Sequence, residues 1–213
     1  MKQILKSGEA EVIVKKSRFI GEAHRITGEE EAALLVAETR KKYYDARHVC
    51  YAYSFGDTNP RLKFSDDGEP KGTAGKPILD IVNGSGVQDI LIIVTRYFGG
   101  ILLGTGGLVR AYSDAAKEAL LAAKTGELVE CVNRKFSGIA YGDYDKIRFI
   151  LEKCGITDYE TEYGSDVAVK AYIPVQYDED ICKDISDSTR GTCTAENLGI
   201  SKVIRDMESL NEA

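Results

Sequence analysis

The residues best suited to bind a ligand lie between Tyr97 and Tyr112. This segment holds five of the 21 glycines within nine residues: Gly99, Gly100, Gly104, Gly106 and Gly107. Glycine tolerates positive φ angles and leaves backbone N–H groups uncovered, and the helix expected next adds roughly half a positive charge at its N-terminus. Such a junction favours an anion, most obviously phosphate. We therefore predict a binding surface here rather than a catalytic centre.

Side chains around the glycines could complete this surface. Arg96 before the turn and Arg110 after it could add fixed positive charge. Three aromatic side chains could stack on a base: Tyr97, Phe98 and Tyr112. Two alternatives stay open, because the glycines could instead permit close helix-on-strand packing and Arg110 could pair with Asp114 four residues on. The pattern matches neither Gly-x-x-x-x-Gly-Lys-Ser/Thr nor Gly-x-Gly-x-x-Gly, so it indicates an anion without identifying it.

Two basic groups elsewhere could contact phosphate as well. Arg18 follows the Lys15-Lys16 pair at a predicted hairpin tip, and Arg47-His48 enters the next strand. The alternative for the tip is a plain solvated turn. His48 has no nearby Ser or Cys in a recognisable nucleophile setting, so we predict no catalytic residue.

A polar segment at residues 65–77 contains three carboxylates in four residues. Asp66, Asp67 and Glu69 could bind a hard cation such as Mg²⁺. Asp-Asp-Gly is also ordinary turn chemistry, and Thr73 is a candidate N-cap for a following short helix. We favour the turn and predict no metal site and no cofactor.

Charge and cysteine content narrow the class of partner. The net charge is -6, but residues 1–126 carry +2 and residues 127–213 carry -8. Any RNA contact must therefore come from a local basic patch on the first domain, while the acidic half is interpreted as a solvated face.

The five cysteines, Cys50, Cys131, Cys154, Cys182 and Cys193, contain no Cys-x-x-Cys pair, so neither a zinc site nor a disulfide framework is expected.

The chain shows no membrane or secretion signal. The longest apolar runs, such as 90–94, fall far short of the roughly 20 residues that a membrane span needs. The first six residues break into charge before a signal-peptide core could form. We expect a cytoplasmic protein with no membrane partner.

The hydrophobic pattern predicts an α+β chain of two domains, 1–125 and 126–213. In the first, alternation predicts strands at 9–14, 18–23, 48–55 and 61–65, and the run 88–96 predicts a strand buried on both faces. Helices are expected at 29–43, around 78–84 and at 108–123. In the second, strands at 127–140, 156–163, 167–175 and 192–203 and helices at 143–154 and 179–188 give a ferredoxin-like βαββαβ order. The last residues, 208–213, are expected to fray.

Long motifs in two segments, 65–77 and 94–112, resemble the IMPACT family. The resemblance is to its bacterial YigZ branch, which has two domains and no RWD domain. The motifs are SDDGEP at 65–70, GTAG at 72–75, VTRYFGG at 94–100 and LGTGGLVRAY at 103–112. The residues around Arg18 and Arg47-His48 are also similar to family positions, and the second half looks like the family's small C-terminal domain. The resemblance covers essentially the whole chain.

The resemblance implies a fold and a role. The first domain is expected to share the fold of the second domain of a small-subunit ribosomal protein and of elongation factor G domain four, and the second to resemble the last domain of that factor. Both relatives touch ribosomal RNA, so the resemblance implies a non-enzymatic protein that binds RNA or the ribosome. Eukaryotic members restrain a kinase that acts on translation initiation, through a region that includes an RWD domain.

Two alternatives accompany this reading. The fold superfamily contains small-molecule kinases, which implies an ATP/Mg-dependent phosphotransferase using the glycine-rich turn. Such loops usually carry serines, whereas residues 103–107 offer one Thr and no Ser or Lys. The other alternative is a protein-interaction regulator of translation, which needs only an exposed surface.

Overall fold

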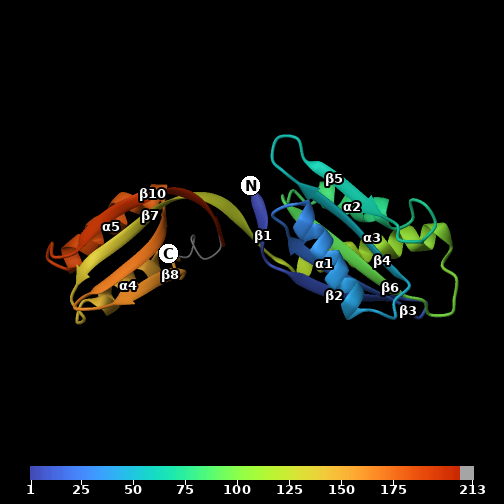
Figure 1. Cartoon of the computed structure of the whole chain (residues 1–213), viewed down its shortest axis with the longest axis horizontal. Helices are drawn as coiled ribbons and strands as arrows, with labels where there is room; N and C mark the ends of the chain where they lie inside the picture. Colours follow the sequence, from blue (N-terminus) through green and yellow to red (C-terminus); the bar gives the residue numbers. More distant parts are fainter. Residues whose placement is uncertain (207–213) are drawn as a thin grey trace. The chain divides into compact units, whose positions relative to one another are not determined.

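The computed structural model describes residues 1–206 and has an α+β architecture. The described chain contains two antiparallel sheets and five α-helices (Figure 1). It divides into two compact units, Met1–Gly126 and a second that begins at Glu127. The predicted fraying at 208–213 lies outside the described residues. None of the described helices is long and apolar enough to cross a membrane.

The first unit is a five-stranded sheet with helices on both faces. Its elements are β1 (Lys2–Lys6), β2 (Gly8–Val14), β3 (Ser17–Arg25), α1 (Glu29–Lys42), β4 (His48–Phe55), β5 (Arg61–Ser65), α2 (Gly75–Gly84), β6 (Ile90–Tyr97) and α3 (Gly104–Ala122). The sheet order is β2-β3-β6-β4-β5, and each neighbouring pair is antiparallel. One hydrophobic cluster joins a sheet face to α2 and α3, and another joins the opposite face to α1.

Strand β6 lies at the centre of this sheet and is buried on both sides. Ile90, Ile92 and Val94 belong to the cluster shared with α2 and α3. Leu91 and Ile93 belong to the cluster shared with α1. A strand covered on both faces needs apolar residues without alternation, so the prediction from the β-branched run is confirmed.

Helix α3 approaches strands β2 and β3 closely because small residues line the contact. A Cβ placed on Gly21 would overlap the backbone of Ala115, and one placed on Gly8 would overlap the backbone of Ala119. Both alanines are fully buried. The glycines that permit close helix-on-strand packing thus include Gly8 and Gly21 of the first hairpin, which lie outside the predicted glycine-rich segment.

The described part of the second unit contains two α-helices that pack with strand residues in one hydrophobic core. Its elements are β7 (Lys124–Ile139), which begins before the unit boundary, α4 (Tyr144–Lys153), β8 (Tyr159–Tyr163), β9 (Val167–Pro174), the short 3₁₀ helix η1 (Val175–Tyr177), α5 (Asp178–Ser188) and β10 (Thr194–Arg205). The strands of this unit lie in the order β10-β7-β9-β8, and β1 also pairs with β7, so that it belongs to this five-stranded sheet rather than to the first. Ile147 and Leu151 of α4 and Ile181 and Ile185 of α5 pack with buried strand residues.

The structure corrects three details of the sequence prediction. Strand β1 was not predicted, because its short segment shows no clear alternation, although Ile4 is buried. Helix α3 begins at Gly104 rather than at 108, so three of the glycines belong to its first turn. Thr73 is not the N-cap of α2, since its hydroxyl donates to the Pro70 carbonyl.

Candidate anion-binding surface

The predicted site residues meet at one end of the first sheet. Strand pairing sets Arg18 of β3 opposite Tyr97 of β6, and Arg96 of β6 opposite His48 of β4. The glycine-rich loop leaves β6 at this same end, and α3 begins after it. Residues that are distant in sequence are therefore neighbours, because three antiparallel strands end or begin together.

The loop is anchored to the tip of the first hairpin at Gly99. Its N–H donates to Ser17 Oγ at 3.1 Å, and a Cβ at this position would overlap the backbone of Lys16. Lys15 and Lys16 form the tight turn, both with positive φ. Close packing therefore explains the glycine at 99 and fixes the loop beside a lysine pair.

The next glycines face open space instead. Gly100 has φ 82° and Gly104 has φ 72°, a region that L side chains rarely adopt. A Cβ on either, or on Gly106, would meet nothing within 4 Å, whereas one on Gly107 would meet Leu103 Cβ at 3.1 Å. Packing alone therefore does not explain Gly100, Gly104 and Gly106, because the side-chain position of each is open.

The N-terminus of α3 has no side-chain cap. Leu103 occupies the N-cap position, and the first turn contains no acidic residue. Gly104, Thr105 and Gly106 are exposed. The N–H groups of a first helical turn have no partner within the helix, and the helix dipole makes this end positive. An anion in front of Gly104 could accept these N–H groups.

Four basic side chains around this surface make no ion pair with any described residue. They are Lys15, Lys16, Arg47 and Arg110, all of them exposed. Arg110 makes no ion pair with Asp114. It lies one turn after Gly106, on the same face of α3. Helical side chains lean toward the N-terminus, so Arg110 is placed to reach an anion at the first turn.

Arg18 and Tyr97 form a second, partly engaged pair at this end. Arg18 makes a bidentate contact with Glu11, with Nη2 at 2.8 Å from Oε2, and its guanidinium lies 5.5 Å from the centre of the Tyr97 ring. The Tyr97 hydroxyl donates to Asp45 at 2.7 Å, and this bond raises its pKa to about 12. Arg18 is about half exposed, so it can exchange Glu11 for a phosphate.

Arg96 lies beneath the surface rather than on it. It is 6% exposed, and its Nη1 contacts Glu69 Oε1 at 2.5 Å. Its guanidinium stands 5.4 Å from the Phe19 ring centre and 5.5 Å from that of Phe98. The Tyr112 hydroxyl donates to the same Glu69 oxygen at 2.9 Å. Arg96 therefore holds the loop around Glu69 to β6, instead of offering its charge to solvent.

Of the three aromatic residues proposed for stacking, Tyr112 is excluded by its burial. It is fully buried and packs edge-on against Phe19, with ring centres 5.1 Å apart. Burial raises the pKa of its hydroxyl well above the usual range. Phe98 is 49% exposed in the loop that precedes α3 and offers an aromatic face to a base.

His48 and Cys50 complete the buried side of this end. His48 Nδ1 donates to the Asp67 carbonyl at 2.8 Å. Cys50 Sγ lies 3.5 Å from the Tyr112 hydroxyl, and burial raises the pKa of the thiol to about 12. A thiol with so high a pKa is a poor nucleophile at neutral pH. The hydrogen bond of His48 connects β4 to the loop at Asp67.

The carboxylate of Asp66 caps the start of α2. Its oxygens accept the backbone N–H groups of Gly72 at 2.8 Å, Ala74 at 3.0 Å and Gly75 at 2.8 Å. Burial alone would raise the pKa of Asp66, but these three donors outweigh it and hold the pKa below the usual value. Asp66 therefore accepts the N–H groups at the start of α2, the role that the sequence suggested for Thr73.

The other two carboxylates of this segment are also engaged. Asp67 accepts Arg40 Nη2 and the Val49 N–H, both at 2.6 Å, and these bonds outweigh burial to lower its pKa. Glu69 is held by Arg96 and Tyr112, as described above. Among the described residues no three His, Cys, Asp or Glu side chains converge to hold a metal ion. The three carboxylates tie the loop to α1, α2, α3 and the sheet.

Comparison with known proteins places the chain in a family. Residues 15–120 match the model of the Impact N-terminal domain, and residues 138–192 match a Domain of unknown function (DUF1949). The chain is 38% identical to IMPACT family member YigZ of Escherichia coli (strain K12), over 84% of this chain and 88% of that protein. The chain belongs to the IMPACT family.

A further member of the IMPACT family and a solved structure are similar to most of the chain. IMPACT family member YvyE of Bacillus subtilis (strain 168) is 35% identical over 80% of this chain and 78% of that protein. A solved structure described as the crystal structure of an hypothetical protein is 34% identical, with a TM-score of 0.57, and covers 93% of this chain and 97% of that one. The chain thus resembles these proteins over most of its length.

Proposed function

We propose that the protein is a non-enzymatic, cytoplasmic regulator of translation that binds structured RNA or the ribosome through its first unit. The observation that carries this proposal is the exposed first turn of α3, which has no side-chain cap, at the same end of the sheet as four exposed cations that form no ion pair with a described residue: Lys15, Lys16, Arg47 and Arg110. A phosphate group satisfies both features, because it accepts backbone N–H groups and pairs with cations. Phe98 adds an exposed aromatic face for a base.

The fold supports the same proposal. We propose that the first unit shares the architecture of the second domain of a small-subunit ribosomal protein and of elongation factor G domain four. The second unit has the element order β7-α4-β8-β9-α5-β10 and the strand order β10-β7-β9-β8, which fits a ferredoxin-like domain. Both analogies connect the chain with proteins that touch ribosomal RNA.

The proposal is tested by binding of purified ribosomes and of ribosomal RNA at several salt concentrations. Each phosphate contact contributes about 0.7 to 0.9 to the slope of log affinity against log salt. We expect Arg110→Ala and the double variant Lys15→Ala/Lys16→Ala to weaken binding and to make this slope shallower. Lys117→Ala is the matched control, since Lys117 is an exposed cation two turns further along α3.

Two outcomes would contradict the proposal. Affinity that does not change with salt would exclude phosphate contacts as the basis of binding. An equal loss in Arg110→Ala and Lys117→Ala would show that general charge, not the start of α3, attracts the RNA.

Exposed apolar residues in the same loop favour a second candidate, a protein partner in translation. Leu102 is 83% exposed and Ile101 is 43% exposed, next to Phe98. Apolar side chains grouped on a surface are typical of protein contacts. Capture of partners from a lysate with and without nuclease distinguishes the two, because a protein contact persists after RNA is digested.

A further inference from the structure

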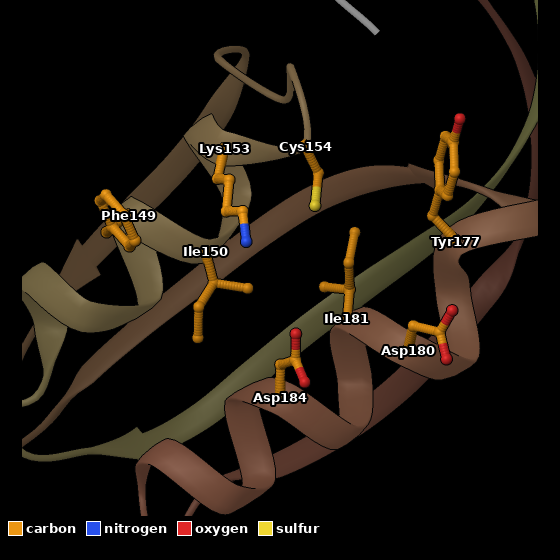
Figure 2. A pocket seen from close by; sticks show the side chains of 8 residues that line it. All are labelled: Phe149, Ile150, Lys153, Cys154, Tyr177, Asp180, Ile181 and Asp184. Carbon is orange, nitrogen blue, oxygen red and sulfur yellow. The ribbon is translucent and has the colours of Figure 1, made fainter. Parts of the chain in front are cut away.

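The second unit contains a groove between its two helices, α4 and α5. The cavity in it has a volume of about 320 Å³, and its walls come from the two helices and from Tyr177 before α5 (Figure 2). Ile150 of α4 and Ile181 of α5 supply apolar surface, and Ile181 is 2% exposed. This surface is independent of the candidate site in the first unit, because every residue that lines it belongs to the second.

The rim of the groove carries an aromatic residue that its own unit does not cover. Phe149 lines the cavity from α4, yet it is 66% exposed. A large aromatic side chain beside an apolar cavity is a typical anchor of a protein interface. A small ligand inside the cavity would leave most of Phe149 in water, whereas a peptide lying along the groove would cover it.

The α5 wall of the groove is acidic and unpaired. Asp180 and Asp184 lie one helical turn apart, and neither makes an ion pair with a described residue. The half of the chain that contains them carries a net charge of -8. Lys153 and Asp184 reach into the space between the helices from opposite sides (Figure 2). The acidic row repels a nucleic acid and attracts a basic partner.

We propose that this groove binds a basic amphipathic helix of a partner protein. One apolar side chain of that helix fills the cavity between Ile150 and Ile181 and packs against Phe149. Two Lys or Arg residues four positions apart pair with Asp180 and Asp184, whose own spacing is also four residues. Lys153 on the opposite wall donates to one carboxylate of the partner and so sets the direction of the bound helix. Helix α4 has 10 residues, about 15 Å, which matches roughly three turns of a bound helix.

The test uses the full chain and a fluorescent synthetic peptide of about 14 residues, with leucines on one helical face and lysines on the other. Fluorescence anisotropy at about 0.1 M salt measures its affinity. We expect saturable binding at one site. The same peptide with Glu in place of every Lys, and a scrambled basic peptide that has lost its apolar face, are expected not to bind.

Protein variants separate the groove from general charge attraction. We expect the double variant Asp180→Asn/Asp184→Asn and the variant Phe149→Ala each to weaken peptide binding about tenfold. Asp187→Asn removes one negative charge, half of what the double variant removes, from an exposed residue of α5 that does not line the cavity, so the affinity should stay within about twofold of wild type. Thermal unfolding checks that each variant is folded.

Alkylation of Cys154 locates the peptide directly. Cys154 lines the cavity, while Cys193 packs elsewhere in the same core, and burial raises the pKa of both thiols. We expect the peptide to slow alkylation of Cys154 and to leave Cys193 unchanged, as measured by mass spectrometry of digested protein.

Three results would overturn the proposal. One is weakening by Asp187→Asn that is at least half of the double variant's in free energy, which indicates attraction by net charge alone. Another is binding that is insensitive to Phe149→Ala together with unprotected Cys154. The third is a concentration-dependent dimer that Phe149→Ala abolishes, since the groove would then be covered by a second copy of the chain.

Discussion

Arg96 is buried against Glu69, although its charge suggests a contact with phosphate. It ends a run of apolar strand residues, and its charge is neutralised by Glu69 from a loop 27 residues earlier. Tyr112 of α3 donates to the same carboxylate. This buried group of three holds the loop, the central strand and the first helical turns of α3 together, and so positions the open surface above it.

We predict that Arg96→Ala lowers the stability of the protein by about 3 to 5 kcal/mol, because it leaves the buried Glu69 carboxylate without its countercharge. Tyr112→Phe removes one hydrogen bond to Glu69 and is expected to cost about 1 kcal/mol. Urea unfolding followed by circular dichroism measures both.

Arg47→Ala is the control for this prediction, since Arg47 is exposed and the change should stay within about 0.5 kcal/mol of wild type. If Arg96→Ala retained full stability but lost RNA binding, Arg96 would have to face the ligand, and the positioning role would be wrong.

Sequence reasoning identified the residue types of the candidate site but not which of them are buried. Arg18, Arg47, His48, Arg96 and Tyr97 were grouped by type, and strand pairing does bring their positions to one end of the sheet. The burial of Arg96 and Tyr112 depends on Glu69, and a partner 27 or 43 residues away leaves no local pattern. The sequence did, however, contain a signal for the burial of Arg96. A charged residue that ends a run of buried apolar positions needs a partner of opposite charge.

Helix α3 is the element on which the proposed function depends. Its C-terminal half is rich in alanine, and its position was predicted from this composition. Its start at Gly104 could not be predicted, because glycine is a poor helix former and the first turn is stabilised by contacts that follow it, such as buried Leu108 and Ala111. The helix end that carries the anion site was therefore the least predictable part of the helix.

We predict that Thr105→Asp raises stability while it weakens RNA binding. A carboxylate in the uncapped first turn interacts favourably with the helix dipole, by about 0.3 to 1 kcal/mol, and it occupies the N–H groups that a phosphate would use. Thermal unfolding measures the first effect, and ribosomal RNA binding the second.

Thr105→Asn is the matched control for shape, because it differs from the aspartate variant only in charge and should leave most of the RNA affinity. If Thr105→Asp stabilised the protein but left RNA affinity intact, the phosphate would not lie at the start of α3.

The whole chain combines two units of different charge, and each has its own core. Residues 1–126 carry +2 and residues 127–213 carry -8, and the hydrophobic clusters of the two units share no residue. The pattern of the second half predicted the element order of the second unit, because turn residues separate its helices and strands. The groove between α4 and α5 was not predicted, since Phe149 and Asp184 are ordinary helix residues until packing sets them beside one cavity.

Two separate ligand surfaces on one chain should respond independently to mutation. We predict that Arg110→Ala weakens ribosomal RNA binding and leaves the affinity for the basic peptide within about twofold of wild type. The double variant Asp180→Asn/Asp184→Asn should weaken peptide binding, and it should leave RNA affinity unchanged or slightly higher because it removes two negative charges. The two ligands are measured in separate titrations, because a basic peptide binds RNA by itself. A loss of RNA binding in the double aspartate variant would show that both ligands depend on one surface and would contradict the division of roles between the units.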